Sequence, residues 1–185
     1  MLLINEQNIK KHLDVKSLIK EIKLTFIKSE YVPLRKSYNI NKNKPYDHSQ
    51  LLIMPSFIKG NYYGVKLLNV FPQNPLKGME RVKALYVLFN KKNGSIYSIL
   101  DGTELTKHRT AAMSALASKF LSNKKSKKLL IIGTGALAPY MISAHISVRP
   151  IEEVFVWGRN YKKAKKIVES FQNNNVKLTA TKNLE

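Results

Sequence analysis

The feature that most constrains the fold is a glycine-rich hexapeptide between an apolar run and a helical stretch. Residues 129–132 are followed by Gly133-Thr134-Gly135-Ala136-Leu137-Ala138, which fits the pattern G-x-G-x-x-G/A. There the first glycine permits a tight turn, the second lets a pyrophosphate approach the backbone, and the third small residue lets the helix pack closely on the strand. The N–H groups at the start of the helix then attract the phosphates. We predict a dinucleotide-binding turn, with a turn that binds nothing as the alternative. Its candidate cofactor-binding residues are Gly133, Thr134, Gly135, Ala136 and Leu137.

The sequence around this turn alternates between two periodicities. Strand-like runs at 129–132, 154–157 and 176–180 are separated by helical stretches at 136–148 and 160–171. A β-α-β-α-β alternation is typical of a parallel sheet, and a wholly apolar run such as 129–132 predicts a strand buried on both faces. We therefore expect residues 123–185 to form the first half of a Rossmann domain.

The preceding part of the chain has a different pattern. A helix is expected from the cap Asp14 to about residue 30, with Phe26 and Ile27 in its apolar stripe. Strands are expected at 50–54, 62–70, 82–89 and 95–100, followed by a turn at 101–103. Thr106 is expected to cap an alanine-rich helix at 107–121 that packs through Phe120 among others. Residues 1–122 are thus predicted to be an α+β domain, which makes the whole chain α/β.

The end of the second strand of the alternating region indicates the form of the dinucleotide. An acid there would accept a hydrogen bond from the ribose 2′-hydroxyl of NAD, whereas an arginine suits the 2′-phosphate of NADP. This strand is followed by Gly158-Arg159-Asn160, with no acid. We therefore favour NADP(H), with NAD(H) as the alternative, and take Arg159 and Asn160 as cofactor-binding candidates.

Composition limits the other partners. The chain has 32 Lys and Arg against 12 Asp and Glu, a net charge of +20. Most of the basic residues are lysines, whereas nucleic-acid readers favour arginine, so we interpret them as solvated faces and do not expect a nucleic-acid partner. With no cysteine and four scattered histidines, we expect no metal site. No run is long enough to span a bilayer and no signal peptide is recognisable, so we expect no membrane partner and a cytoplasmic protein.

Three cations stand out in the first part of the chain. Lys66 lies in an apolar strand, where a charge is costly unless it is paired. Arg109 is expected in the first turn of the alanine-rich helix, where a cation opposes the helix dipole. Arg35 lies in an extended segment. Cations that converge would hold a carboxylate, but the sequence alone does not bring these three together, and each has an exposed cation as its alternative interpretation.

A series of segments resembles a known family. They are Gly64-Val65-Lys66, Asn69-Val70-Phe71-Pro72-Gln73-Asn74, Leu100-Asp101-Gly102-Thr103-Glu104-Leu105-Thr106, Arg109-Thr110-Ala111-Ala112, Ser114-Ala115-Leu116-Ala117, Gly133-Thr134-Gly135-Ala136 and Ala144-His145. In this order they resemble the ornithine cyclodeaminase/mu-crystallin family. The resemblance implies that residues 1–122 are a substrate-binding and dimerisation domain of a homodimer. It likewise implies a small amino- or imino-acid substrate whose carboxylate is held by Arg35, Lys66 and Arg109. It also implies that Thr110 contacts the cofactor.

The resemblance further implies hydride transfer between a nicotinamide and the substrate α-carbon, with Lys66 as the candidate catalytic residue. An arginine at position 159 resembles the NADP-using ketimine reductases and crystallins, so we expect reduction of pyrroline- or piperideine-2-carboxylate. The alternatives are NAD-dependent conversion of ornithine to proline and ammonia, an alanine-type dehydrogenase, and a non-catalytic crystallin-like binder. The family's catalytic aspartate has no match in this sequence. We therefore expect a fragment or a protein that has lost its chemistry, and leave open whether the chain is an enzyme.

Overall fold

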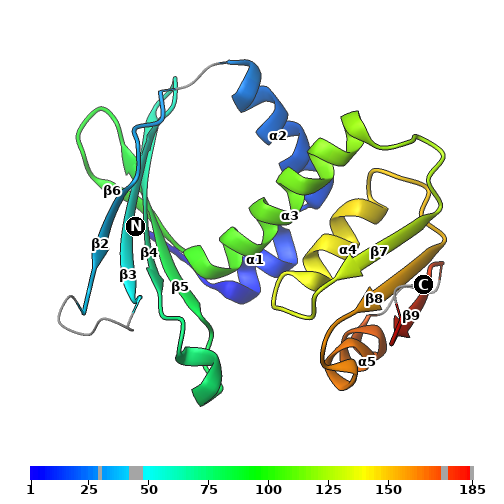
Figure 1. Ribbon diagram of the computed structural model, residues 1–185. Coiled ribbons are helices and arrows are strands. Elements are labelled where there is room, and N and C mark those ends of the chain that lie inside the picture. Colours follow the sequence, from blue (N-terminus) through cyan, green and yellow to red (C-terminus); the bar gives the residue numbers. More distant parts are fainter. Residues whose placement is uncertain (29–30, 42–47, 172–174, 184–185) are drawn as a thin grey trace. The chain divides into compact units, whose positions relative to one another are not determined.

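The computed structural model describes residues 1–28, 31–41, 48–171 and 175–183. The chain divides into two compact units, which are described separately (Figure 1). The first unit comprises Met1–Leu13 and Thr25–Thr106, and the second comprises Asp14–Leu24 and Lys107–Glu185. The expected α/β class is confirmed, because the first unit combines helix with a mainly antiparallel sheet and the second is built on parallel strands. The expected functional division after residue 122 is not tested by this clustering and stays a prediction.

The first unit is a six-stranded sheet in the order β1-β6-β5-β4-β3-β2. Its strands are β1 (Leu2–Ile4), β2 (Lys36–Asn39), β3 (Gln50–Phe57), β4 (Tyr62–Val70), β5 (Val82–Asn90) and β6 (Ile96–Asp101), with a 3₁₀ turn at Asn74–Lys77. The expected meander is confirmed, since β3 to β6 pair with their neighbours in antiparallel fashion. No sequence pattern predicted β1, which pairs with β6 in parallel, or the helix α1 (Glu6–His12) that follows it.

The two faces of this sheet differ in exposure. One face is buried and carries Leu52, Gly64, Lys66, Leu68 and Ser98. The opposite face is formed by cross-strand rows of apolar side chains that are half-buried or exposed, and we call it the apolar face. Its central rows are Ile53, Leu67 and Leu85; Pro55, Val65 and Val87; and Phe57, Tyr63 and Phe89.

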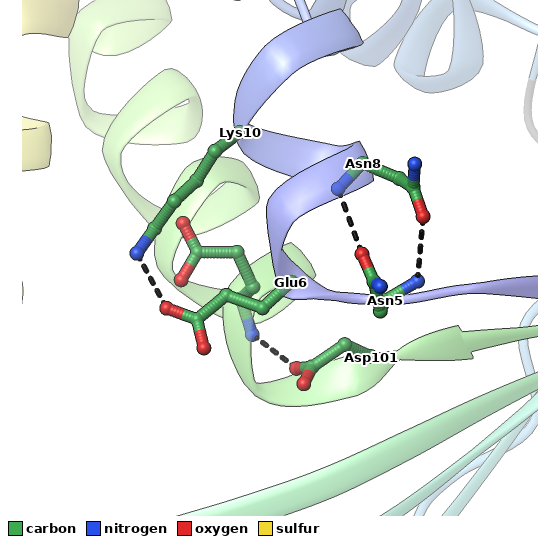
Figure 2. A network of polar contacts seen from close by, with 6 residues as sticks. Asn5, Glu6, Asn8, Lys10 and Asp101 are labelled. Atoms are coloured by element: carbon green, nitrogen blue, oxygen red, sulfur yellow. Dashed lines mark hydrogen bonds and ion pairs between the residues drawn. The ribbon is translucent and has the colours of Figure 1, made fainter.

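Two capped helices begin beside the end of β6. Asn5 and Asn8 form a capping box at α1, and Lys10 forms an ion pair with Glu6 (Figure 2). The carboxylate of Asp101 accepts a hydrogen bond of 2.8 Å from the backbone N–H of Glu104. This contact starts the helix α3 at once, so the expected turn at residues 101–103 is wrong.

Helix α3 spans Gly102–Leu121, and so begins five residues before the expected position. Thr106 is therefore inside the helix and does not cap it, and its hydroxyl donates to the carbonyl of Gly102 at 2.6 Å. Arg109 likewise lies well inside the helix, so its predicted place in the first turn is wrong. The early start depends on Gly102, where a Cβ would approach the backbone N of Leu85 to 2.7 Å.

The second unit contains a three-stranded parallel sheet in the order β7-β8-β9. Its elements are β7 (Lys128–Ile132), α4 (Ala138–Ile146), β8 (Glu153–Trp157), α5 (Tyr161–Ser170) and β9 (Lys177–Thr181). The predicted β-α-β-α-β alternation is confirmed. Ile142 of α4 and Ala164 of α5 pack with Val154 and Val156 of β8 in one core, so both helices cover the same face of the sheet.

The other face of this sheet carries Leu130 and Ile132, whose side chains are 46% and 65% exposed. Within the described residues, strand β7 is therefore half-buried on one face and exposed on the other, and the predicted burial on both faces is wrong. The physical reason is that the helices that pack on this sheet, α4 and α5, share the opposite face. None of the helices in the described ranges is long and apolar enough to cross a membrane.

A second core lies between α4 and two further helices. Helix α2 (Val15–Ile27) starts at Asp14, whose carboxylate accepts from the backbone N–H of Ser17 at 2.8 Å, so the predicted cap is confirmed. Ile19 of α2 packs with alanines of α3 and with Ala144 of α4. Phe26, Ile27 and Phe120 are more than 60% exposed in the structure, so the predicted apolar stripes are too wide. The expected end of α2 near residue 30 lies outside the described residues.

Candidate functional site

The glycine turn joins the end of β7 to the start of α4, as predicted. Gly133 has a positive φ of 128°, which favours glycine, and its N–H donates to the carbonyl of Trp157 at 2.7 Å. This hydrogen bond fastens the turn to the end of β8. Ala138, the first residue of α4, is 5% exposed, in agreement with the close helix packing expected there.

Gly135 differs from the other glycines of the chain. A Cβ built at this position meets no atom within 4 Å, and its φ is not in the left-handed range. The seven other glycines have either a positive φ or a neighbouring atom within 3.0 Å of the Cβ position. Neither backbone strain nor packing among the described residues therefore accounts for glycine at 135.

Ala136 and Leu137 complete the turn, and Leu137 is 36% exposed. The backbone N–H of Ala138 donates to the carbonyl of Gly135 at 3.0 Å, which closes the turn tightly. The helix therefore begins two residues later than the predicted residue 136. Its first N–H groups lie directly after the turn, in the position where they can face a phosphate.

The end of β8 lies against the glycine turn. A Cβ at Gly158 would approach Cγ2 of Thr134 to 2.6 Å, so the side chain of Thr134 is packed over this glycine. Arg159 follows and is exposed. The side chain of Asn160 caps α5 by accepting from the backbone N–H of Lys163 at 3.2 Å. The structure thus brings together four predicted residues, Gly133, Thr134, Arg159 and Asn160, and gives Asn160 a structural task.

The end of β9 reaches the same edge of the sheet, because the three strands are parallel. Trp157 Nε1 donates to the backbone carbonyl of Lys182 at 3.0 Å. The ammonium of Lys182 lies 5.1 Å from the centre of the Tyr161 ring. Lys182 was not among the residues predicted to form the site. Only the strand topology places it here, and no motif marks it.

Helix α3 contacts α4 and the segment that follows it. Ser114 Oγ and His145 Nε2 are 3.1 Å apart, and burial lowers the pKa of His145. The guanidinium of Arg149 donates to the carbonyls of Ser118 and Ser122 at 2.8 and 3.0 Å, so it caps the end of α3. These contacts hold the two helices together, and sequence reasoning did not anticipate them.

Arg109 and Thr110 lie on α3 within the second unit, and both are half-buried. The Nε of Arg109 is buried and has no hydrogen-bond partner among the described residues. Burial also lowers the pKa of the Arg109 guanidinium. A buried donor without a partner costs free energy, so this nitrogen fits an anionic ligand that would accept from it.

Lys66 and Arg35 belong to the first unit. Lys66 is 9% exposed on the buried face of β4, directly opposite Tyr86 of β5. The Tyr86 ring covers Gly64, and burial raises the pKa of its hydroxyl. Arg35 is exposed in the segment before β2. Arg109 belongs to the second unit, and the two units are described separately. The prediction that these two cations and Arg109 hold one carboxylate therefore stays a prediction.

Comparison with known proteins decides the family. The family model described as "Ornithine cyclodeaminase/mu-crystallin family" matches residues 1–185. The chain belongs to this family. The family assignment made from the sequence segments is therefore confirmed.

The curated relatives of this family member include several reductases. The Delta(1)-pyrroline-2-carboxylate reductase of Colwellia psychrerythraea is 35% identical over 172 residues, which cover 92% of this chain and 54% of that protein. The chain spans about half the length of the curated relatives it matches.

Solved structures of the same fold carry bound nicotinamide dinucleotides. The Delta(1)-pyrroline-2-carboxylate reductase of Thermococcus litoralis, in complex with NADH and L-proline, has a TM-score of 0.89 at 29% identity, covering all of this chain and 58% of that one. An archaeal alanine dehydrogenase dimer with bound NAD has a TM-score of 0.86 at 25% identity, covering 98% and 56%.

Proposed function

We propose that this chain provides the dinucleotide-binding turn and the carboxylate-binding cations of an NADP(H)-dependent reductase of cyclic imino acids. The observation that carries the proposal is Gly135, because the fold does not require a glycine there. A residue without a Cβ leaves room for the backbone to approach a pyrophosphate. The open space at Gly135 therefore fits a nicotinamide dinucleotide. The similarity of the fold to a reductase solved in complex with NADH supports this ligand.

The substrate assignment is supported by cations and by relatives. The buried Lys66 and the unpartnered Nε of Arg109 are suited to hold a carboxylate, and Arg35 is proposed as a third contact. When bound, a reduced nicotinamide would supply a hydride to the imine carbon, and a proton on the imine nitrogen, taken from solvent, would complete the amine. Holding the carboxylate fixes the imine carbon at near-attack distance, and Lys66 would stabilise negative charge beside it. Thr110, next to Arg109 on α3, is proposed to contact the cofactor.

Binding and turnover test this proposal separately. We expect the purified 185-residue chain to bind NADPH saturably, measured by nicotinamide fluorescence. We expect the protein that contains this sequence to oxidise NADPH when Δ1-pyrroline-2-carboxylate is added. Ammonia release from ornithine would instead indicate a cyclodeaminase, and reduction of pyruvate with ammonia an alanine-type dehydrogenase. Binding without any turnover would indicate a crystallin-like binder, and no binding by a cooperatively folded chain would contradict the dinucleotide site.

The preference for NADP(H) over NAD(H) is supported by Arg159. This arginine is exposed beside the glycine turn, at the end of β8 where a 2′-phosphate is read. Arg159→Asp should weaken NADPH binding by more than about tenfold while sparing NADH, because the variant removes a charge-assisted contact and adds a repulsive charge. Arg81→Asp makes the same charge change at an exposed position of the first unit and serves as the control. Equal loss of both dinucleotides would refute the assignment.

A homodimer is also part of the proposal. The apolar face of the first unit places Leu67 and Leu85 side by side with 36% and 41% exposure, and large exposed apolar patches mark association sites. A second copy of the chain is the proposed occupant, as one fold relative is a dimer. Leu85→Lys should shift the sedimentation coefficient from dimer to monomer, whereas Leu76→Lys, at a position 83% exposed in the 3₁₀ turn, should not. A Leu85→Lys dimer would refute this interface.

The cytoplasm is the proposed location. The absence of cysteine is compatible with a reducing compartment. A tagged copy recovered outside the cytoplasmic fraction would contradict this part of the proposal.

A further inference from the structure

The loop after β9 carries a cation that no sequence motif indicates. In the second unit, β8 and β9 are parallel, with Trp157 opposite Thr181, so the residues after both strands emerge at the same edge. Arg159 follows β8 and Lys182 follows β9. In parallel α/β sheets ligands bind at the carboxyl ends of the strands, which is the edge that both cations share.

We infer that Lys182 is a second determinant of 2′-phosphate recognition and acts together with Arg159. The inference rests on the proposed dinucleotide site at the glycine turn. The proposed ligand of Lys182 is the phosphate monoester dianion that distinguishes NADPH from NADH. Two features of the molecule support this role, namely the position of the Lys182 side chain and the distribution of charge around the sheet.

The position of Lys182 is fixed by two contacts of its own and by one between its two neighbours. Its carbonyl accepts the indole N–H of Trp157 at 3.0 Å, and Thr181 Oγ1 donates to the carbonyl of Asn183 at 2.7 Å. Its ammonium lies 5.1 Å from the ring centre of Tyr161, which is the first residue of α5. Tyr161 comes two residues after Arg159 in the chain. The contact with its ring therefore holds the ammonium of Lys182 next to the short segment that carries Arg159.

The charges of this sheet are distributed unequally between its two edges. At the amino ends of the strands, Lys127 and Lys128 form ion pairs with Glu152 and Glu153, at 2.6 and 3.2 Å. At the carboxyl ends the first turn of α5 contains no acid. Four exposed cations gather there without an ion pair among the described residues: Arg159, Lys162, Lys163 and Lys182.

Like charges at one edge repel one another, and a bound dianion would relieve that repulsion. NADPH brings such a dianion on its 2′-oxygen, whereas NADH brings a hydroxyl. Lys182 therefore contributes to the preference between the two cofactors and contributes little to the binding of the parts that they share. A lysine that only packed on Tyr161 would affect both cofactors alike.

The experiment measures the dissociation constants of NADPH and NADH for the full 185-residue chain and three variants. Lys182→Ala removes the ammonium, Lys182→Arg keeps the charge, and Lys177→Ala removes an exposed lysine at the amino end of the same strand. We expect Lys182→Ala to weaken NADPH about tenfold and to change NADH by less than about twofold. Lys182→Arg and Lys177→Ala should retain the wild-type ratio of the two constants.

The double variant Arg159→Ala/Lys182→Ala sharpens the test, because it should bind the two cofactors with nearly equal affinity. An unchanged NADPH constant in Lys182→Ala, or an equal loss for both cofactors, would overturn the inference while leaving the dinucleotide site intact. Failure of the wild-type chain to bind either dinucleotide would instead overturn the proposed function and this inference with it.

Discussion

The glycines of the two units differ in what lies where a side chain would be. Gly64 and Gly102 represent the first unit in this comparison, and Gly135 represents the second. At Gly64 a Cβ would lie 2.5 Å from Cζ of Tyr86, and at Gly102 it would lie 2.7 Å from the backbone N of Leu85. At Gly135 that place is empty to 4 Å. The first two glycines therefore allow the protein to pack against itself, whereas Gly135 leaves room that the described residues do not use.

The strongest test of this difference is Gly102→Ala. The new Cβ would meet three backbone atoms of residues 84 and 85 at 2.7 to 2.8 Å, and backbone in a central strand cannot give way as a side-chain end can. Alanine gains about 1 kcal/mol of helix propensity over glycine, but overpacking should lower the free energy of unfolding by about 3 kcal/mol. Urea denaturation measures the change, and an unaltered midpoint would contradict the packing argument.

Gly64→Ala should have the next largest effect. Here the neighbour is the ring of Tyr86, which can move only by leaving its place opposite Lys66. We expect a loss of about 2 kcal/mol in the free energy of unfolding. A double-mutant cycle with Tyr86→Val checks the cause, because removal of the ring should make the second substitution cost less. Strictly additive effects would show that Tyr86 does not require the glycine.

The two regions also differ in how far the sequence predicts them. The glycine turn and its alternating strands and helices follow from short-range patterns, so the elements from β7 to β9 and the positions of Gly133 and Gly135 could be predicted. The start of α3 could not, because Asp101-Gly102-Thr103 favours a turn as much as a helix. What decides it is the backbone of Leu85, which is distant in sequence.

The candidate site shows the same limit. Arg159 is predictable because it follows a recognisable strand, and Lys66 because a lysine in an apolar strand is unusual. Lys182 lies in Thr-Lys-Asn, in a chain rich in lysine, and the parallel register of β8 and β9 is what places it at the same edge of the sheet as Arg159. The partners of His145 and Arg149 are also distant in sequence, so no local pattern indicates them.

Gly158 is intermediate between the two kinds of glycine, and Gly158→Ala should show this. Its Cβ would approach Cγ2 of Thr134 to 2.6 Å, and that methyl group belongs to the cofactor turn itself. We expect a loss of about 1 kcal/mol in stability together with weaker NADPH binding, because a short side chain can yield only by moving the turn. Thr134→Ser removes the methyl group. The double variant Gly158→Ala/Thr134→Ser should therefore regain much of the stability and of the NADPH affinity that Gly158→Ala loses. No rescue would mean that Thr134 is not the reason for Gly158.

Gly135→Ala should have the smallest effect on stability and tests the comparison most sharply. Since its φ is not in the left-handed range and no atom lies near, alanine should leave the free energy of unfolding unchanged or raise it by up to about 1 kcal/mol. The same methyl group would occupy the space proposed for the pyrophosphate, so NADPH and NADH should both bind at least about tenfold more weakly. Urea denaturation and fluorescence titration of the one variant measure the two quantities side by side. A loss of stability like that expected for Gly102→Ala would show that folding requires glycine at position 135. Unchanged binding of both dinucleotides would show that the dinucleotide does not occupy the empty space at Gly135.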